Sequence, residues 1–581
     1  MLHGVKRKGF LRVASIMPFP VCEKETCQIS DPIGKASTLD LTSHKQDVVQ
    51  IAIEPETSPA ELFQDERNSS MYLNNSHTIE IEAKGLNPVV VFVQTDEGNQ
   101  TPVAFKTGIN VKAGKDVIGN NMKFLDVEKY TPIQKSHEAY LKELMEYCKD
   151  TPRHPSYHIH PPCGLVNDPN GLAYFGGKYH VFYQWFPFGP EHGMKHWAHV
   201  ISEDLVKWEW SDQMLIPDQE YEKNGCYSGN SIEADGKLYL YYTANYKTEQ
   251  GKIPKQAMAV MNSDGTILKS PNNPIIDEQP EGLIGEIRDP FVFEKEGAYW
   301  MLLGGGSTDG QARLILYKST DLENWVYQGN IELTGIDLEL GYMYECPSYI
   351  EIDGKDVLFL SLMGRTPMGE RFHNEFSSVY FVGELSLEDK TFHVESFDEI
   401  DKGFDFYAPQ AFYGKDRQPM MFAWLGCGAQ ELPYAKEDMW IHSLTMPRFL
   451  TIKEGKLCQE VPENIKNEYA HLDIDSKRIK PEEDTWYINL TDKQISEIQI
   501  GDQEDHLSIK IDWAAGHIVA DRSTLKHQFS TEYGIQREVS MSEELKNIEI
   551  YYDNTFIEIY LNDGKDTMTL RVISRKCRKL I

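Results

Sequence analysis

One pattern of hydrophobic and polar positions recurs through the middle of the chain. A turn of polar residues or glycine is followed by a strand rich in apolar and aromatic residues, as in DGKLYLYYTA at 235–244. The same pattern is found at 176–185, 296–305, 353–362 and 415–424, roughly every 60 residues. A hairpin that recurs at a fixed long period indicates a propeller or a solenoid. Five such units predict a five-bladed β-propeller.

A second repeated element favours the propeller over an ordinary antiparallel β-protein, in which hairpins are also common. The pattern Ser-x-Asp-Leu-x-x-Trp occurs at 202–208 and again at 319–325. A repeated motif and a regular spacing together indicate repeated structural units.

The pattern changes on both sides of this region. Residues 1–45 look irregular, whereas 46–133 hold short alternating runs that predict a small β-rich module. Apolar positions at helical spacing predict a linker helix within 134–153, which prolines end. The propeller is expected over 154–450, and short alternating strands predict a C-terminal β-sandwich over 455–581. The predicted fold class is therefore all-β.

Composition narrows the set of partners. The chain has 581 residues, and its 90 acidic and 58 basic side chains give a net charge of −32, which argues against nucleic acid and anionic membranes as partners. The nine cysteines show no C-x-x-C pair and no metal-binding spacing, which is typical of free thiols in a reducing compartment. We find no signal peptide and no membrane-spanning apolar run, so we expect a cytoplasmic protein. Whether it forms a homo-oligomer is left open.

Three acidic residues stand in unusual, proline-flanked contexts. Asp168 lies in LVNDPNG, Asp289 in EIRDPFVF and Glu345 in MYECPSY. A proline favours extended geometry in the residue before it, which would fix the direction of a carboxylate. One Asp-Pro pair is an ordinary turn, but three such acids on three predicted blades indicate a shared pocket at the propeller channel.

Carboxyl groups that meet in an aromatic-rich pocket are suited to glycoside hydrolysis. One carboxylate attacks the anomeric carbon or activates water, and the other group protonates the leaving oxygen. Their environments must push the two pKa values apart. A third acid can hold sugar hydroxyls and stabilise the developing positive charge.

Several motifs occur in the order found in one enzyme family. They are NDPNG, FYQ, HWAH, YSGN, RDP, EC, FDFYAPQ and AWLG…LTMPR. From about residue 154 onward the chain resembles the β-fructofuranosidases of glycoside hydrolase family 32, such as invertases and sucrose-6-phosphate hydrolases. The resemblance implies a five-bladed propeller followed by a β-sandwich, in agreement with the repeat pattern. The N-terminal 150 residues carry no resemblance that we recognise.

The resemblance also implies residue roles. Asp168 would be the nucleophile that forms a covalent fructosyl intermediate, Glu345 the general acid and base, and Asp289 the transition-state stabiliser. Such a retaining reaction implies that the carboxyl groups of Asp168 and Glu345 lie roughly 5–5.5 Å apart. No metal or organic cofactor is expected. The implied sugar contacts are Leu165, Val166, Asn167, Gln184, Trp197, Tyr227, Ser228, Arg288 and Trp424.

The expected substrate is sucrose or sucrose 6-phosphate. The missing export signal favours the phosphorylated sugar, because sucrose imported by a phosphotransferase system arrives phosphorylated. Lys195, Arg365 and Arg371 are candidates to meet that phosphate. Two alternatives stay open: a fructan exohydrolase that acts on inulin or levan, and a non-catalytic sugar-binding propeller. Histidines 192, 196 and 199 lack a matching set of acids or cysteines, so hydrogen bonding is favoured over metal binding.

Overall fold

A computed structural model describes most of the chain after residue 126 and three short strands before it. The described residues are 26–30, 36–40, 80–83, 127, 129–249, 251–337, 339–432, 434–471, 485–502 and 504–573. The chain divides into two compact units, Met1–Met122 and Lys123–Ile581. Each unit is described by itself.

In the first unit, a three-stranded antiparallel sheet has the order β2-β1-β3. Its strands are β1 (Thr26–Ser30), β2 (Ala36–Asp40) and β3 (Glu80–Ala83). Strands β1 and β2 fall within 1–45, where the sequence pattern predicted no regular structure. Alternation over only five residues is too short to stand out from the surrounding sequence. Within the module predicted over 46–133, the structure describes β3 and the last few residues. The rest of that module lies outside the described residues.

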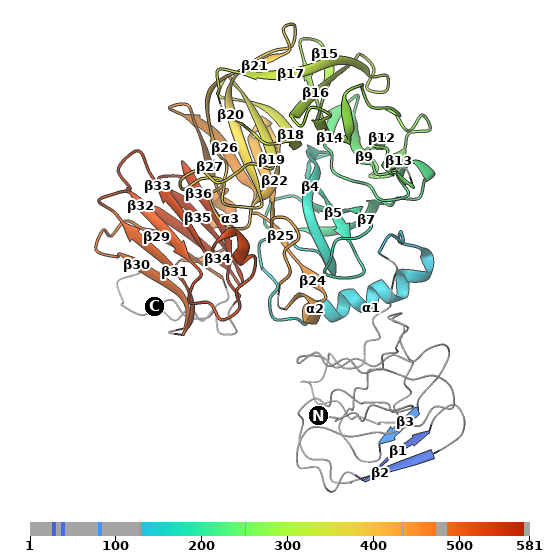
Figure 1. The fold of residues 1–581 in the computed structure, drawn as a ribbon, viewed down its shortest axis with the longest axis vertical. Helices are drawn as coiled ribbons and strands as arrows, with labels where there is room; N and C mark the ends of the chain where they lie inside the picture. The colour runs from blue at the N-terminus through green and yellow to red at the C-terminus, as the bar shows by residue number, and fades with distance from the viewer. Residues whose placement is uncertain are drawn as a thin grey trace. The chain divides into compact units, whose positions relative to one another are not determined.

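The predicted linker helix is α1 (Glu138–Lys149), which follows a 3₁₀ turn η1 (Lys135–His137). Tyr140, Leu141, Leu144 and Cys148 form one buried face at helical spacing. The helix docks on the propeller, because the Tyr147 hydroxyl donates to the Glu437 carbonyl at 2.7 Å. Figure 1 shows α1 alongside α2 (Ala435–Asp438). No helix in the described parts of the chain is long and apolar enough to cross a membrane.

The predicted propeller is confirmed, with five blades arranged in a ring (Figure 1). Blades three and four are joined into one eight-stranded sheet by the parallel pairing of β17 with β21, and blades one and five each carry one additional short strand, β24 and β25. Blade one consists of β4 (Gly164–Phe175), β5 (Lys178–Phe186), β6 (His196–Ser202) and β7 (Glu209–Leu215), and blade two of β8 (Ser231–Ala234), β9 (Lys237–Ala244), β12 (Lys255–Met261) and β13 (Ile267–Lys269). Blade three consists of β14 (Leu283–Lys295), β15 (Ala298–Ser307), β16 (Ala312–Ser319) and β17 (Val326–Thr334), and blade four of β18 (Met343–Ile352), β19 (Lys355–Met363), β20 (Phe376–Ser386) and β21 (Thr391–Glu399). Blade five consists of β22 (Tyr407–Tyr413), β23 (Pro419–Leu425), β26 (Arg448–Lys453) and β27 (Lys456–Glu460).

Smaller elements connect and close these blades. They are η2 (Glu220–Glu222), β10 (Lys247–Thr248), β11 (Gly251–Lys252), η3 (Lys415–Arg417), β24 (Trp440–Ile441), β25 (Ser443–Leu444) and α3 (Glu463–Lys466). Strand β24 returns to pair with β4 in parallel, so the end of the propeller closes onto its first blade. The fifth blade runs to Glu460, beyond the residue 450 expected from the sequence, because β26 and β27 lack the aromatic pattern of the other hairpins.

The inner strands of four blades share a β-bulge at a proline. Pairing with the second strand shifts register at Pro169, Pro290, Pro347 and Pro409. A proline has no N–H to give to the ladder, so a bulge is where a central strand can hold one. The residue before the proline has a left-handed φ at Asp289 (62°), Cys346 (46°) and Ala408 (49°). The extended geometry expected before proline is therefore wrong for Asp289, because the bulge overrides the local preference.

The predicted C-terminal β-sandwich is confirmed. Its two sheets have the orders β28-β29-β34-β35-β36 and β30-β31-β32-β33. The strands are β28 (Ala470–His471), β29 (Thr485–Leu490), β30 (Glu497–Asp502), β31 (Asp505–Asp512), β32 (His517–Asp521), β33 (Gln536–Ser540), β34 (Ile548–Asp553), β35 (Phe556–Leu561) and β36 (Asp566–Arg571), with a 3₁₀ turn η4 (Thr531–Tyr533). Their facing side chains form one apolar core.

Buried ion pairs join the sandwich to the propeller. Arg448 of blade five lies 2.6 Å from Glu558 of the sandwich, and neither side chain has exposed surface. Arg571 of the sandwich lies 3.0 Å from the equally buried Asp405 of the propeller. These pairs fix the two domains against each other.

Candidate active site

The three candidate acids come together at the bulges of β4, β14 and β18. Cys346, which follows Glu345, is their meeting point. Its backbone N–H donates to Asp289 Oδ2 at 2.9 Å. Its thiol sulfur lies 3.5 Å from Asp289 Oδ2 and 3.9 Å from Asp168 Oδ2. Acids that are far apart in sequence are thus neighbours at the start of three inner strands.

Three polar side chains donate hydrogen bonds to Asp168. The Ser228 hydroxyl and the Gln184 amide donate to Oδ2, the amide at 3.2 Å, and the Asn167 amide donates to Oδ1 at 3.2 Å. Asn167 is held in turn by Lys195, whose ammonium donates to its carbonyl at 2.7 Å. This network fixes the direction of the Asp168 carboxylate.

The carboxyl groups titrate together. Burial raises the pKa of Asp168, the Ser228 hydrogen bond opposes this, and the nearby Glu345 carboxylate raises it further. Burial and then Glu345 raise the pKa of Asp289 to about 7 from an ordinary value of 3.8. Like charges this close in a buried site favour retention of a proton within the cluster near neutral pH.

Glu345 is held from both sides. Arg288 Nε donates to Oε1 at 2.8 Å, and the Tyr407 hydroxyl donates to Oε2 at 2.6 Å. Arg288 also pairs with Glu286, which pairs with Lys252 at 2.8 Å. Sequence reasoning missed Tyr407, although it lies in the FDFYAPQ motif and directly precedes another residue–proline pair, Ala408-Pro409.

Most of the implied sugar contacts lie at this cluster. Asn167, Gln184 and Ser228 bond Asp168, and Arg288 bonds Glu345, as described above. Tyr227 is half-buried, with the Lys252 ammonium 5.9 Å from its ring centre. Trp424 lies edge-on to His192 at 6.0 Å, and its buried indole N–H has no partner among the described residues.

Three other implied contacts are buried in the core of the first blade. Trp197 has no exposed surface, packs 5.9 Å from Phe182, and donates its indole N–H to the Tyr227 carbonyl at 2.9 Å. It supports Tyr227 from behind. Leu165 and Val166 are only 1% and 0% exposed. Strand β4 is covered on both faces, so its apolar side chains have no route to a ligand.

The three cations proposed for a phosphate are already engaged. Lys195 is buried behind Asn167, and burial lowers its pKa to about 7. Arg371 pairs with Asp398 at 2.8 Å, and Arg365 donates to the Glu339 carbonyl at 2.7 Å. Their partners are distant in sequence, so the composition around these residues did not show them.

The histidines of HGMKHWAH make hydrogen bonds, as expected. His196 Nε2 accepts the backbone N–H of Ile133 at 3.0 Å. His199 lies flat against Phe182 at 3.9 Å and contacts the Gln213 carbonyl through Nδ1 at 3.1 Å. These contacts use the ring nitrogens within the fold.

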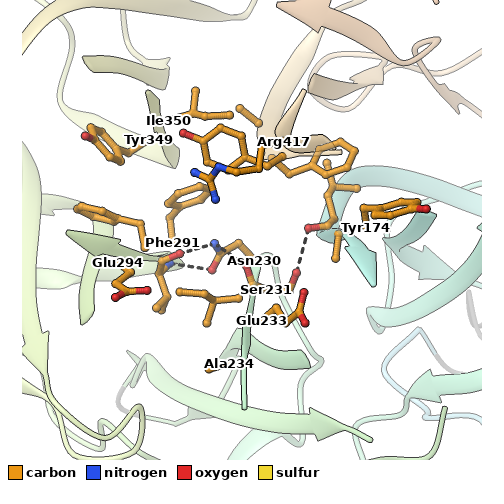
Figure 2. Close-up of a pocket in the computed structure, with 18 of the residues that line it drawn as sticks. Tyr174, Asn230, Ser231, Glu233, Ala234, Phe291, Glu294, Tyr349, Ile350 and Arg417 are labelled. Carbon is orange, nitrogen blue, oxygen red and sulfur yellow. Dashed lines mark hydrogen bonds between the residues drawn. The ribbon is translucent and has the colours of Figure 1, made fainter. Parts of the chain in front are cut away.

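A large pocket lies away from the acids. Below them, one small residue from each blade lines a narrow part of the channel: Pro169, Gly229, Pro290, Pro347 and Pro409. Beyond this ring, a pocket of about 790 Å³ lies at the far ends of the inner strands (Figure 2). There, Asn230 exchanges two hydrogen bonds with the backbone of Val292, at 2.8 and 2.9 Å, and so ties neighbouring blades together. The acids and this pocket occupy opposite ends of the channel.

A propeller that brings three buried or half-buried carboxyl groups together at one end of its channel, each held by hydrogen-bond donors, has the features of a glycoside hydrolase. Comparison with known families agrees. Residues 158–461 match the N-terminal domain of the glycosyl hydrolases family 32. The chain belongs to this family.

Several relatives are similar over most of their length. The chain is 32% identical over 461 residues to a sucrose-6-phosphate hydrolase of Staphylococcus xylosus, covering 77% of this chain and 92% of that protein. It is 32% identical to the enzyme of the same name from Bacillus subtilis, covering 72% and 89%. Among solved structures, the sucrose-6-phosphate hydrolase from Lactobacillus gasseri has a TM-score of 0.70 at 29% identity, covering 78% and 95%. A family 32 β-fructofuranosidase of Bombyx mori has a TM-score of 0.65 at 28% identity, covering 76% and 97%.

Proposed function

We propose that this protein hydrolyses the β-D-fructofuranosyl bond of sucrose 6-phosphate, with sucrose as a poorer substrate. The observation that carries the proposal is the meeting of Asp168, Asp289 and Glu345 at three bulges. The curated relatives that align over most of the chain are named sucrose-6-phosphate hydrolases, which supports the phosphorylated sugar. Because such a substrate occurs inside cells, a cytoplasmic location stays part of the proposal.

The first half-reaction cleaves the glycosidic bond. The Asp168 carboxylate attacks C2 of the fructosyl unit, and its three hydrogen-bond donors, two on Oδ2 and one on Oδ1, fix its direction. Glu345 gives its proton to the leaving oxygen, so glucose 6-phosphate departs and a fructosyl ester remains on Asp168. Asp289 accepts hydrogen bonds from fructose hydroxyls and stabilises the positive charge that develops at C2.

The second half-reaction restores the enzyme. Glu345, now a carboxylate, takes a proton from water as that water attacks C2. The ester bond to Asp168 breaks and β-fructose leaves with retained configuration. Arg288 and Tyr407 keep Glu345 in place through both steps, and the proton that Glu345 takes from water is the one it gives to the leaving oxygen in the next turnover.

The alternatives have less support. An exo-inulinase from Aspergillus awamori shares the fold with a TM-score of 0.61, but at 21% identity this likeness concerns the fold alone. A purely sugar-binding role does not require three coupled acids with a dedicated hydrogen-bond network.

The first experiment compares kcat/KM on sucrose 6-phosphate and on sucrose. A preference of a hundredfold or more for the phosphate ester supports the proposal. Equal values would instead indicate a general invertase, and inactivity on both would turn attention to fructans or to binding alone. Asp168→Asn should abolish turnover without loss of folding, while Asp212→Asn, an exposed acid on the same blade, serves as the control. Near-normal rates in Asp168→Asn would contradict the mechanism.

A further inference from the structure

A segment that precedes the family 32 match packs beside the active site. The backbone N–H of Met194 donates to the Lys129 carbonyl at 2.7 Å. Four residues later, the backbone N–H of Ile133 donates to His196 at 3.0 Å. These bonds hold Lys129 and Tyr130 against the strand that begins just after Lys195.

A lysine-bearing hairpin meets this segment from the second blade. The hairpin consists of β10 and β11, which pair in antiparallel register. The Lys247 ammonium lies 5.2 Å from the ring centre of Tyr130. The Lys252 ammonium lies 5.9 Å from the ring centre of Tyr227. The two tyrosines are themselves neighbours, because the Tyr130 phenol contributes to the raised pKa of Tyr227.

This hairpin is linked to the catalytic acids by charged contacts. Lys252 pairs with Glu286, Glu286 with Arg288, and Arg288 with Glu345. On the other side, Lys195 donates to Asn167 of the Asp168 network at 2.7 Å, and the residue before it, Met194, bonds the Lys129 carbonyl. Lys129, Tyr130 and Lys247 therefore lie at the edge of the same site.

The charge of this edge is opposite to that of the protein as a whole. The chain has a net charge of −32, yet Lys247 has no ion pair among the described residues. Lys129 has only a long, exposed contact with Glu191 at 3.8 Å. Other lysines of the same blade are neutralised: Lys255 pairs with Asp277, and Lys223 pairs with Glu220 at 3.1 Å. Lys247, which has no acidic partner among the described residues, and the exposed Lys129, which has a long one, together favour an anion beside the sugar site.

We propose that Lys129 and Lys247, with Tyr130 positioning Lys247, bind the phosphate group on the leaving sugar of the substrate. A phosphate monoester carries a charge of about −1.5 to −2 near neutral pH and offers three acceptor oxygens. An ammonium group binds it as a mobile point charge. The inference rests on the proposed function. It replaces Lys195, Arg365 and Arg371, which are engaged elsewhere, as the phosphate-binding residues.

The test is the ratio of kcat/KM on sucrose 6-phosphate to kcat/KM on sucrose. We expect Lys247→Ala and Lys129→Ala each to lower this ratio about tenfold or more, with activity on sucrose within about twofold of the wild type. Lys247→Arg should retain most of the preference. Lys223→Ala is the matched control and should leave the ratio unchanged. Tyr130→Ala alone should lower the ratio. The Tyr130→Ala/Lys247→Ala double variant should have nearly the same ratio as Lys247→Ala, because Tyr130 acts through Lys247.

Inhibition of sucrose hydrolysis gives a second measurement. Glucose 6-phosphate should inhibit the wild type more strongly than glucose does, and the Lys129→Ala/Lys247→Ala double variant should lose that difference. A double variant that keeps the wild-type ratio overturns the inference, while the proposed function stands. A wild-type ratio near one overturns the phosphate preference itself, and this inference with it. The two failures are therefore distinguishable.

Discussion

The Ser228 hydroxyl controls the ionisation of the proposed nucleophile. It donates to Asp168 Oδ2, and this is the strongest of the contacts that hold the pKa of Asp168 down against burial. Ser228→Ala removes the hydroxyl and leaves the Gln184 and Asn167 amides as donors. The pKa of Asp168 should then rise further. Because only the carboxylate can attack, the acidic limb of the pH–rate profile should move to higher pH.

The expected size of this shift follows from the hydrogen bond that is lost. A hydrogen bond to a charged group contributes about 1.5–3 kcal/mol, and one pKa unit corresponds to about 1.4 kcal/mol. The loss would destabilise the ionised form of Asp168 by about that amount of free energy. The two remaining amide donors can turn toward the freed oxygen, so we expect the lower end, about 1.5 kcal/mol, or roughly tenfold in the ionisation equilibrium.

The assay is kcat/KM on the better sugar substrate from about pH 4 to pH 9. Ser228→Ala should lose about tenfold at pH 5 and much less at pH 8. Ser231→Ala is the control: its hydroxyl donates to the Leu172 carbonyl at 2.9 Å at the far end of the channel (Figure 2). An acidic limb that stays in place in Ser228→Ala, with activity lowered equally at every pH, would refute the reasoning.

Three further predictions concern the acids and the domain junction. Asp289 has a pKa of about 7 in the folded protein against an ordinary value of 3.8, so the folded protein binds a proton on its carboxyl group more tightly than the unfolded chain does. The free energy of unfolding should therefore fall as the pH rises from about 4 to 7. Asp289→Asn should remove this loss of stability, which urea unfolding of the wild type and the variant at pH 5 and pH 8 measures. A variant with the same pH dependence of stability as the wild type would contradict the prediction. Tyr407→Phe should lower kcat about ten- to hundredfold with little change in melting temperature, because one charge-assisted hydrogen bond to Glu345 is lost; a normal kcat would exclude the positioning role. Arg448→Met leaves Asp401 buried without its cation and leaves Glu558 with His158 as its one basic partner among the described residues. It should cost about 3–5 kcal/mol of unfolding free energy in urea denaturation; a loss below about 1 kcal/mol would show that the junction does not depend on Arg448.

The fold could be predicted well because its repeat is local. Each hairpin holds its turn and its apolar strand within ten residues, so the period is visible without any knowledge of contacts. The outer strands β26 and β27 carry little aromatic pattern, and the predicted end of the propeller therefore fell ten residues short. Side-chain direction was harder to predict. Trp197 has the residue type of a sugar platform, but strand β6 is covered on both faces, and nothing local shows that Trp197 faces Phe182.

Charge pairing was the least predictable feature. Arg371 and Asp398 are separated by a hairpin and a strand, and only the closed fourth blade brings them to 2.8 Å. Lys247 and Lys129 were passed over because they lie outside the family motifs. Their significance depends on Lys247 having no ion pair among the described residues and on the contact of Lys129 with Glu191 being long and exposed, and neither fact can be read from composition.

The bulges explain how one local rule builds the whole site. In four blades the two residues before the bulge proline are Asn167-Asp168, Arg288-Asp289, Glu345-Cys346 and Tyr407-Ala408. The residues directly before the proline gather Asp168 and Asp289 around the Cys346 thiol. The residues one place earlier join in blade order, Arg288 to Glu345 and Glu345 to Tyr407. The residues directly before the prolines thus supply the coupled carboxyl groups of Asp168 and Asp289. The residues one place earlier hold Glu345, the proposed acid, between its two donors, Arg288 and Tyr407. A third carboxylate in place of Cys346 would add a like charge to a pair that already retains a proton. Burial and the two carboxylates raise the pKa of the Cys346 thiol well above its usual value, so this position stays neutral and its S–H can donate to Asp289.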